Sequence, residues 1–307
     1  MTKLFACCLI FLFYACTLLQ PIPSNTQYTN QSGSIEVSTN NSIIQEQTPE
    51  PNDSIKIENT WGDYYGKFEN LRGESLKRHL HFVIRNHTTI SYQQVWNALE
   101  FTDQCDSIED NVVLIYSMRS QAKSQRDRGT KFDYASNGYS LIDSWNREHV
   151  WPKSHGFPNE KDTAYTDLHH LRPADRSINS ARNTRSFDYS DEVYFDNGGK
   201  DRTNNKTSRD QYSWEPPDEV KGDIARMMFY MVVRYEGPDY DLELVDYIVP
   251  NNNKTPTLGK LSTLIAWHKL DPVDDRERRR NDLIFNKYQY NRNPFIDHPE
   301  FVDLIWN

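Results

Sequence analysis

Cysteine is scarce in this chain. Only 4 cysteines occur among 307 residues, and three of them, Cys7, Cys8 and Cys16, fall in the apolar N-terminal segment. Removal of that segment would leave Cys105 alone, which excludes an internal disulfide. The body must therefore be stabilised by a packed core, which an aromatic content of 13% supports.

The chain also lacks an excess of positive charge and a glycine-rich phosphate loop. Its 35 Lys and Arg residues are outnumbered by 44 Asp and Glu residues, which gives a formal net charge of −9. A generic basic surface for nucleic acid is therefore disfavoured, although a local basic groove on an acidic body is not.

The N-terminal segment has the features of an export signal. Residues 1–20 begin with a charged residue, Lys3, and continue as an apolar run that is short for a membrane span. We expect cleavage near residues 20–26. The sequence around Cys16 also resembles a lipoprotein cleavage site, so a lipid anchor there and an uncleaved anchor stay open. The protein is expected to be secreted, extracellular or held in a bacterial envelope.

Composition divides the rest of the chain into a tether and a body. Residues 21–60 are polar, with few large apolar side chains, which predicts a disordered segment. The folded body is expected to be one domain over residues 61–307. In that body, the sequence pattern predicts a buried strand at 111–118 and a polar loop at 190–213. A capping box at Ser91 and Gln94 predicts the start of one helix. Apolar periodicity predicts further helices at 74–85, 217–236, 257–270 and 272–289.

One stretch concentrates groups that bind metals or move protons. Residues 145–187, WNREHVWPKSHGFPNEKDTAYTDLHHLRPADRSINSARNTRSF, contain four histidines together with several arginines and carboxylates. Residues 145–152 predict a short strand and residues 167–171 a second extended piece. Pro173 suits the first turn of a helix, so residues 174–183 are predicted to be helical.

These residue types suit phosphodiester hydrolysis. His149 is a candidate general base because its unperturbed pKa lies near neutrality. Glu148 offers a hard oxygen ligand, and Asn179 offers a neutral carbonyl oxygen for Mg²⁺ or Ca²⁺. Arg182, on the same predicted helix face as Asn179, suits bidentate binding of a phosphate. Because neighbouring strand residues point to opposite faces, a bulge or twist is expected if Glu148 and His149 serve one site.

A basic run precedes this stretch. Residues 119–131 contain five Lys or Arg residues and a single acid, Asp127. They form either a solvated loop or a surface that steers phosphates, with Arg126, Arg128 and Lys131 as the residues of interest. The arginines at helical spacing in residues 272–289 leave the same two alternatives open.

The sequence resembles a known nuclease family. WNREHVWPKSHG followed by DLHHLRPADRSINSARNT is similar to the endonuclease I family of secreted and periplasmic bacterial enzymes, a branch of the ββα-metal nucleases. KGDIARMMFYMVVRY and AWHKLDPVDDRERRRNDLIFNKYQYNRNPFI resemble later motifs of that family, in the same order. The resemblance covers about residues 61–307. It implies an α+β fold, in which a ββα-metal core with a small antiparallel sheet is flanked by helices.

The resemblance also implies a chemistry. It points to a Mg²⁺-dependent, non-specific endonuclease that cuts DNA and often RNA, with Ca²⁺ or Mn²⁺ as alternative ions. By motif, Glu148 and Asn179 would be the metal ligands and His149 the general base. Asp167 and His169 match a recurring Asp-x-His and would support the site from behind the ligands. No protein partner is implied, and a monomer is expected.

The arginine that stabilises the transition state stays open. Arg182 matches the arginine after the metal-binding asparagine. However, the insert at residues 156–166 is much shorter than in periplasmic members and lacks the arginine found there, and their disulfide cysteines are absent. Arg172, Arg182 and Arg185 are therefore all candidates. The pattern is closer to that of cysteine-poor extracellular members.

Two other functional classes remain as alternatives. A non-catalytic nucleic-acid-binding envelope protein would keep the fold without its chemistry, although an intact base and ligand set argues against it. In a zinc-dependent hydrolase the ligands would come from four histidines, whose spacing is not that of helical zinc motifs. These are His149, His155, His169 and His170.

Overall fold

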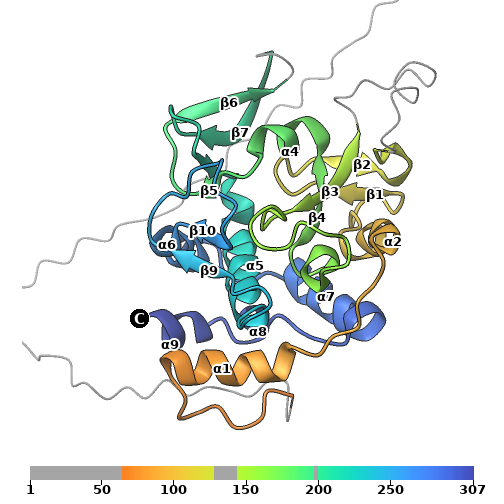
Figure 1. The fold of residues 1–307 in the computed structure, drawn as a ribbon. Helices are drawn as coiled ribbons and strands as arrows, with labels where there is room; N and C mark the ends of the chain where they lie inside the picture. The colour runs from red at the N-terminus through yellow and green to blue at the C-terminus, as the bar shows by residue number, and fades with distance from the viewer. Residues whose placement is uncertain (1–63, 128–143, 197–199) are drawn as a thin grey trace, which may run out of the picture. The chain divides into compact units, whose positions relative to one another are not determined.

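The computed structural model describes residues 64–127, 144–196 and 200–307, all within the unit that spans residues 56–307. In these ranges helices alternate with small sheets, as expected for the α+β class (Figure 1). The predicted signal, lipid-anchor site and tether lie outside the described residues, as do Arg128 and Lys131. No helix in the described ranges is long and apolar enough to cross a membrane.

Helix α5, Lys221–Arg234, lies at the centre of the larger hydrophobic core. Every residue from Lys221 to Val233 is buried, so the helix is buried on all sides rather than on the one broad face that was predicted. Its methionines pack in the core, as expected. Helices α1 (Gly73–Ile84), α6 (Leu261–Leu270) and α8 (Pro294–Asp297) pack against it, and α9 (Phe301–Trp306) packs against α1 (Figure 1).

The first turn of α5 abuts the end of α6 at Gly222. A Cβ atom there would lie 2.0 Å from the carbonyl oxygen of Asp271, so only glycine allows this approach. The Gly222 amide donates to Asp271 Oδ2 at 2.8 Å. One turn later, the buried Arg226 forms a two-pronged ion pair with Glu277 of α7, Asp275–Leu283, at 2.7 and 2.6 Å. Helix α7 continues as a π-helical segment, Ile284–Gln289.

The central stretch forms an antiparallel hairpin followed by a helix. Strand β3, Trp145–His149, pairs with β4, Leu171–Asp175, and α4, Arg176–Arg182, follows directly. Pro173 lies inside β4, so its predicted place in the helix was wrong. Its carbonyl accepts from the Ile115 amide at 2.9 Å, on the side away from β3. The missing N–H faces the same side, so proline removes no bond from the β3–β4 ladder.

A second, smaller core lies under this hairpin. Helix α2, Tyr92–Thr102, begins at the predicted capping box of Ser91 and Gln94 and contributes Val95 and Leu99. The predicted strand at 111–118 is shorter than expected: β1, Asn111–Val113, pairs with β2, Ser120–Ala122, and a short 3-10 turn, Lys123–Gln125, follows. Trp145 and Leu171 bring the hairpin into this core.

The predicted polar loop at 190–213 was wrong. It contains β6, Glu192–Asp196, and β7, Asp201–Thr207, which form a sheet with β5, Ser186–Phe187, and β8, Ser213–Glu215, in the order β5-β8-β7-β6 (Figure 1). Most residues of β6 and β7 are exposed or half-buried, so they lack the apolar alternation by which a strand is recognised. A two-stranded parallel sheet of β9, Glu243–Val245, and β10, Thr257–Gly259, precedes α6.

Candidate active site

A cleft of about 330 Å³ lies where β3 ends and α4 passes beside it. It brings together Glu148, His149 and Asn179, the three residues expected to carry the chemistry. The β3–β4 register is unbroken from Trp145 to His149, so of the expected bulge or twist the bulge was wrong. The cleft lies at the end of the strand, and side chains from both faces of β3 reach it. The lining residues are Tyr92, Arg147, Glu148, His149, Pro152, Lys153, Ser154, Asn179, Ser180, Asn183 and Thr184.

Glu148 is held by two side chains from the protein interior. Its Oε1 atom accepts from the Tyr116 hydroxyl at 2.7 Å and from Arg182 Nη1 at 3.3 Å. Glu148 is only 4% exposed. Burial raises the pKa of Glu148 to about 7, against the opposing effects of Arg182, Tyr116 and Asn179. A buried carboxylate of this kind favours a nearby cation, which would restore its charged form.

The geometry fixes the tautomer of His149. Its Nε2 atom lies 2.9 Å from the carbonyl oxygen of Tyr165. A carbonyl can only accept, so Nε2 carries the proton and Nδ1 keeps its lone pair. Burial, followed by the neighbouring His170, lowers the pKa of His149 well below its usual value. His149 is therefore neutral at pH 7, with Nδ1 able to accept a proton.

Asn179 presents its amide from α4. The side-chain Nδ2 donates to Asn146 Oδ1 at 2.8 Å, which leaves the Asn179 carbonyl oxygen as an acceptor. Asp175 begins this helix by accepting from the Ser177 and Ile178 amides, which sets the position of Asn179. A carboxylate and an amide oxygen facing one cleft are donors that suit a hard divalent cation with several bound waters.

The three arginines proposed for the transition state lie apart from the cleft lining. Arg182 is fully buried, and it donates to the carbonyls of His149 and Val150 as well as to Glu148. Arg172 is also buried and pairs with Asp103 at 2.6 Å and Asp223 at 3.1 Å. Arg185 is half-buried, and its Nε donates to the Gln211 carbonyl at 2.6 Å.

Asp167 and His169 lie behind the loop that holds His149. Asp167 accepts from the hydroxyls of Tyr230 and Tyr235, both at 2.8 Å. His169 Nε2 donates to the Asn291 carbonyl at 3.2 Å. The described hydrogen bonds of these two residues do not reach Glu148, His149 or Asn179. They anchor the segment that follows the 3-10 turn Thr163–Thr166, and that turn supplies the carbonyl bonded to His149.

The four histidines of the zinc alternative face different carbonyls. His155 Nδ1 lies 2.9 Å from the Thr257 oxygen, and His170 Nε2 lies 2.7 Å from the Ala164 oxygen. Among the described residues, no three His, Cys, Asp or Glu side chains gather at metal-binding distance. The zinc alternative therefore lacks a ligand set within those residues.

The candidate basic surface is only partly described. Arg126 pairs with Glu100 at 3.7 Å and lies over the Trp96 ring. In α7, Arg280 is buried on Asp103, whereas Arg279 pairs with Asp106 at 2.8 Å. The arginines of that helix therefore do not form one basic stripe.

The family model for endonuclease I matches residues 72–300 of the chain. This chain belongs to the endonuclease I family. It is 50% identical to an extracellular ribonuclease of Bacillus amyloliquefaciens over 248 residues, which cover 79% of this chain and 78% of the relative. An extracellular ribonuclease of Bacillus subtilis (strain 168) is 49% identical over 248 residues, with the same coverage of 79% and 78%. Endonuclease-1 of Buchnera aphidicola is 26% identical over 189 residues, which cover 59% of this chain and 66% of the relative.

The candidate active site of this endonuclease I family member also contains residues that the sequence did not reveal. Tyr116 holds Glu148 from 32 positions away, and the Tyr165 carbonyl holds His149 from 16 positions away. Lys153 lines the cleft and donates to the Tyr165 hydroxyl at 2.6 Å. Of these, only Lys153 could have been recognised from the sequence, because it follows His149 closely in the most distinctive motif. A contact made by a backbone carbonyl cannot be recognised from the type of residue that supplies it.

Proposed function

We propose that this nuclease is a secreted endonuclease that hydrolyses phosphodiester bonds of DNA and RNA with one divalent cation. The observation that carries the proposal is the cleft itself, in which a neutral histidine with a free Nδ1 lies beside a carboxylate and an amide. The two Bacillus relatives are extracellular ribonucleases, which supports RNA as a substrate and export as the destination.

In this proposal Glu148 and Asn179 hold the cation, and the hairpin and α4 are the core of a ββα-metal nuclease. Their oxygens fit Mg²⁺, with Ca²⁺ or Mn²⁺ as alternatives, because all three ions prefer oxygen ligands. When bound there, the cation would offset negative charge on the scissile phosphate and the leaving oxygen.

His149 acts as the general base. Its Nδ1 removes a proton from the attacking water, and the Tyr165 carbonyl stabilises the imidazolium through Nε2–H as it forms. The low pKa keeps His149 unprotonated at neutral pH, so the base is available. Lys153, in the same cleft, supplies positive charge near the phosphate.

We assign Arg182 a positioning role instead of direct contact with the phosphate. It lies behind Glu148, and its guanidinium also bonds the carbonyls at the end of β3. It therefore fixes the carboxylate and the strand end together. Asp167 and His169 position the neighbouring loop in the same indirect way.

The test is the His149→Ala variant in a supercoiled-plasmid nicking assay and an RNA degradation assay with Mg²⁺. Turnover should fall about 10²- to 10⁴-fold, the usual range for loss of a general base. Cation affinity, measured by calorimetry, should change little because Glu148 and Asn179 remain. His79→Ala is the matched control, since His79 bonds the Tyr65 carbonyl away from the cleft.

Three results would contradict the proposal. A large loss of cation binding in His149→Ala would make His149 a ligand and favour the zinc alternative, as would recovery of chelated enzyme by Zn²⁺ but not by Mg²⁺. Absence of cleavage by the wild-type protein with Mg²⁺, Mn²⁺ or Ca²⁺ would favour a non-catalytic binding protein.

A further inference from the structure

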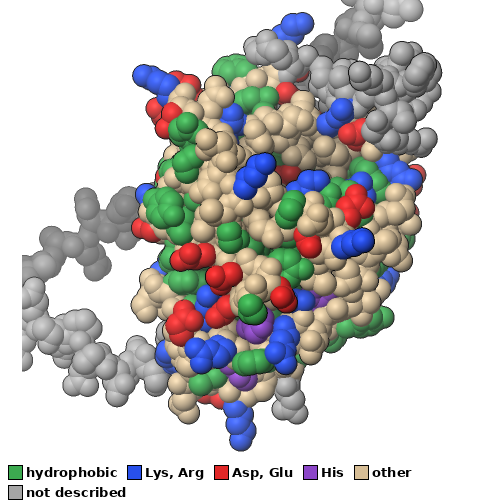
Figure 2. Space-filling model, viewed as in Figure 1, with side chains coloured by type: hydrophobic (Ala, Val, Ile, Leu, Met, Phe, Trp, Pro, Cys, Tyr) green, Lys and Arg blue, Asp and Glu red, His purple; other side chains and the backbone are tan. Residues whose placement is uncertain are grey.

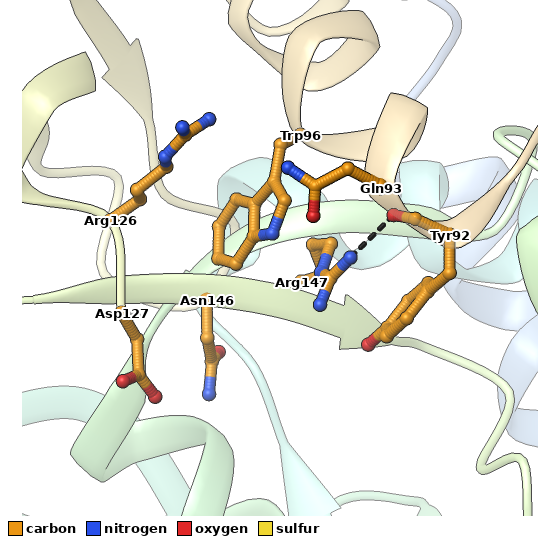
Figure 3. Close-up of a pocket in the computed structure, with 7 residues that line it drawn as sticks. All are labelled: Tyr92, Gln93, Trp96, Arg126, Asp127, Asn146 and Arg147. Carbon is orange, nitrogen blue, oxygen red and sulfur yellow. Dashed lines mark hydrogen bonds between the residues drawn. The ribbon is translucent and has the colours of Figure 1, made fainter. Parts of the chain in front are cut away.

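A second pocket, of about 650 Å³, adjoins the cleft. Figure 3 shows the residues that line this second pocket. It shares two lining residues with the cleft, Tyr92 and Arg147, so these side chains form the boundary between the two spaces. One group of this pocket already bears on the proposed chemistry, since Asn146 orients Asn179 through a hydrogen bond. The pocket is lined by Tyr92, Gln93, Trp96, Arg126, Asp127, Asn146 and Arg147.

Arg147 is the pre-oriented group at this boundary. Its guanidinium carbon lies 3.3 Å from the centroid of the Tyr92 ring and 4.3 Å from that of Trp96. Its Nη1 atom donates to the Tyr92 carbonyl, as the dashed line in Figure 3 shows. Two aromatic rings and a backbone bond therefore hold the side chain in place, which lowers the entropy cost when it binds a ligand.

Arg147 also differs from the buried arginines in its partners. Arg172 and Arg182 form ion pairs with carboxylates, whereas no carboxylate of the described residues lies within ion-pair distance of Arg147. Its Nε atom is buried without a hydrogen-bond partner. A fixed, charged guanidinium that has no carboxylate partner among the described residues has capacity to bind an anion.

The other pocket groups favour an anion over a base. Arg126 adds a second guanidinium, and the acid Asp127 is itself paired with Arg176 at 3.1 Å. Trp96 is only 7% exposed, and Arg147 lies against its ring, so little aromatic surface is open for stacking a base. The amides of Gln93 and Asn146 add polar groups that suit a phosphate or a sugar.

We propose that Arg147 binds the phosphate next to the scissile one, and that this pocket receives the nucleotide attached to it. The inference rests on the proposed function, because it takes the scissile phosphate to lie in the cleft beside Glu148. Arg147 directly precedes Glu148 in β3 and lines both spaces. One nucleic-acid strand can therefore place one phosphate at Arg147 and the next at the cation site proposed for Glu148. A contact to phosphate positions the strand without reading its sequence, which suits an enzyme with no base preference at that position.

The experiment uses thymidine trinucleotides in which one linkage is a neutral methylphosphonate that resists hydrolysis. The two isomers place the uncharged linkage on either side of the cleavable bond, and unmodified trinucleotide is the reference. In the wild-type enzyme, one isomer should lose about 10- to 100-fold in kcat/KM, the range for a charge-assisted hydrogen bond, and the other should lose little.

The same substrates are then given to Arg147→Gln. Its kcat/KM on the unmodified trinucleotide should fall to the level of the sensitive isomer, and neutralising that linkage should have no further effect. Hydrolysis of bis(p-nitrophenyl) phosphate, which has only the scissile phosphate, should fall much less than hydrolysis of the unmodified trinucleotide. Arg278→Gln, an exposed arginine paired with Asp275 on α7, is the matched control and should behave as wild type.

The outcomes separate this inference from the proposed function. Wild-type enzyme that cleaves neither the trinucleotide nor the small diester would refute the proposed function itself. Wild-type enzyme that cleaves both but tolerates either neutral linkage would refute the subsite, whatever the variants show. An Arg147→Gln enzyme that keeps the wild-type sensitivity to the neutral linkage would refute the role of Arg147. If Arg147→Gln does not fold, Arg147→Lys replaces it, and it should retain charge but lose part of the discrimination.

Discussion

Glu148 has opposing influences on its charge. Burial favours the protonated form, and the contacts with Arg182 and Tyr116 favour the carboxylate. Arg182 therefore matters for activity even though it does not line the cleft, because it fixes the side chain that is proposed to hold the cation. Because Arg182 also donates hydrogen bonds to backbone carbonyls, its loss should lower the stability of the fold, an effect not expected for an arginine that only binds phosphate.

Replacement of Arg182 should reveal that difference. Arg182→Met removes the cationic partner of the buried Glu148 and the donor to the Val150 carbonyl, so the free energy of unfolding should fall by about 3–5 kcal/mol, as for other broken buried pairs. Urea denaturation measures the loss. An unchanged stability combined with a higher KM for oligonucleotide would instead show that Arg182 contacts the substrate phosphate.

Asn179 should affect the cation requirement specifically. Asn179→Ala removes one of two proposed protein ligands, so activity at limiting Mg²⁺ should fall at least about 10- to 100-fold and recover in part at high Mg²⁺. Asn179→Asp should retain more activity, because a carboxylate oxygen remains. Ser180→Ala, on the same cleft wall, is the control. Wild-type activity of Asn179→Ala at limiting Mg²⁺ would contradict the assignment.

At the scale of elements, the junction of α5, α6 and α7 depends on buried polar groups. Arg226 of α5 contacts Glu277 of α7 and His268 of α6, so one guanidinium joins three helices. His268 Nε2 donates to the Pro299 carbonyl at 3.0 Å, which leaves Nδ1 to accept from Arg226 at 3.3 Å. Both ring nitrogens are thus committed in the neutral form. Burial, followed by Arg226, lowers the pKa of His268 to about 4.

This junction should weaken in mild acid. The folded-state pKa of His268 lies below the ordinary 6.5, so the unfolded chain binds the proton more tightly and stability falls as the pH drops from about 6.5 towards 4. Between pH 7 and 4.5 the effect is on the order of 2–3 kcal/mol. His268→Gln keeps both bonds without titrating, so it should lose less stability than wild type over that range in urea denaturation. Equal losses would show that His268 is not responsible.

At the scale of the whole molecule, a chain of net charge −9 must bind a polyanion locally. On the face shown in Figure 2, basic and acidic side chains are interspersed and do not form a single basic field. The basic run at 119–131 therefore remains the leading candidate for steering. Of Arg126, Arg128 and Lys131, the structure describes Arg126, which lines the pocket beside the cleft.

Neutralising Arg126, Arg128 and Lys131 together should weaken binding to all sequences about equally. The slope of log affinity against log salt concentration should flatten, by up to roughly 0.9 for each phosphate of duplex DNA that the variant no longer neutralises. The turnover rate at saturating substrate should barely change, because these residues are not expected to touch the reacting phosphate. An unchanged slope would make the run a solvated loop, and Arg276 and Arg279 would be tested next.

Local patterns of the sequence predicted several parts of this protein well. The capping box at Ser91, the apolar α5 and the strand carrying Glu148 and His149 each depend on residues near one another in the chain. The same holds for Asn179 on the helix that follows the hairpin. Residue types at short spacing therefore determined the family and the three central residues of the cleft.

Only the tertiary structure decided how those residues are held and which positively charged side chains reach the cleft. Arg182 and Arg147 are both arginines of the central stretch, yet Arg182 is buried on Glu148 whereas Arg147 borders the cleft between two rings of α2. The polar strands β6 and β7 are likewise stabilised by pairing with each other instead of by an apolar pattern. The physical reason is the same in each case: the deciding partner is a backbone group or a side chain distant in sequence, and burial follows from packing.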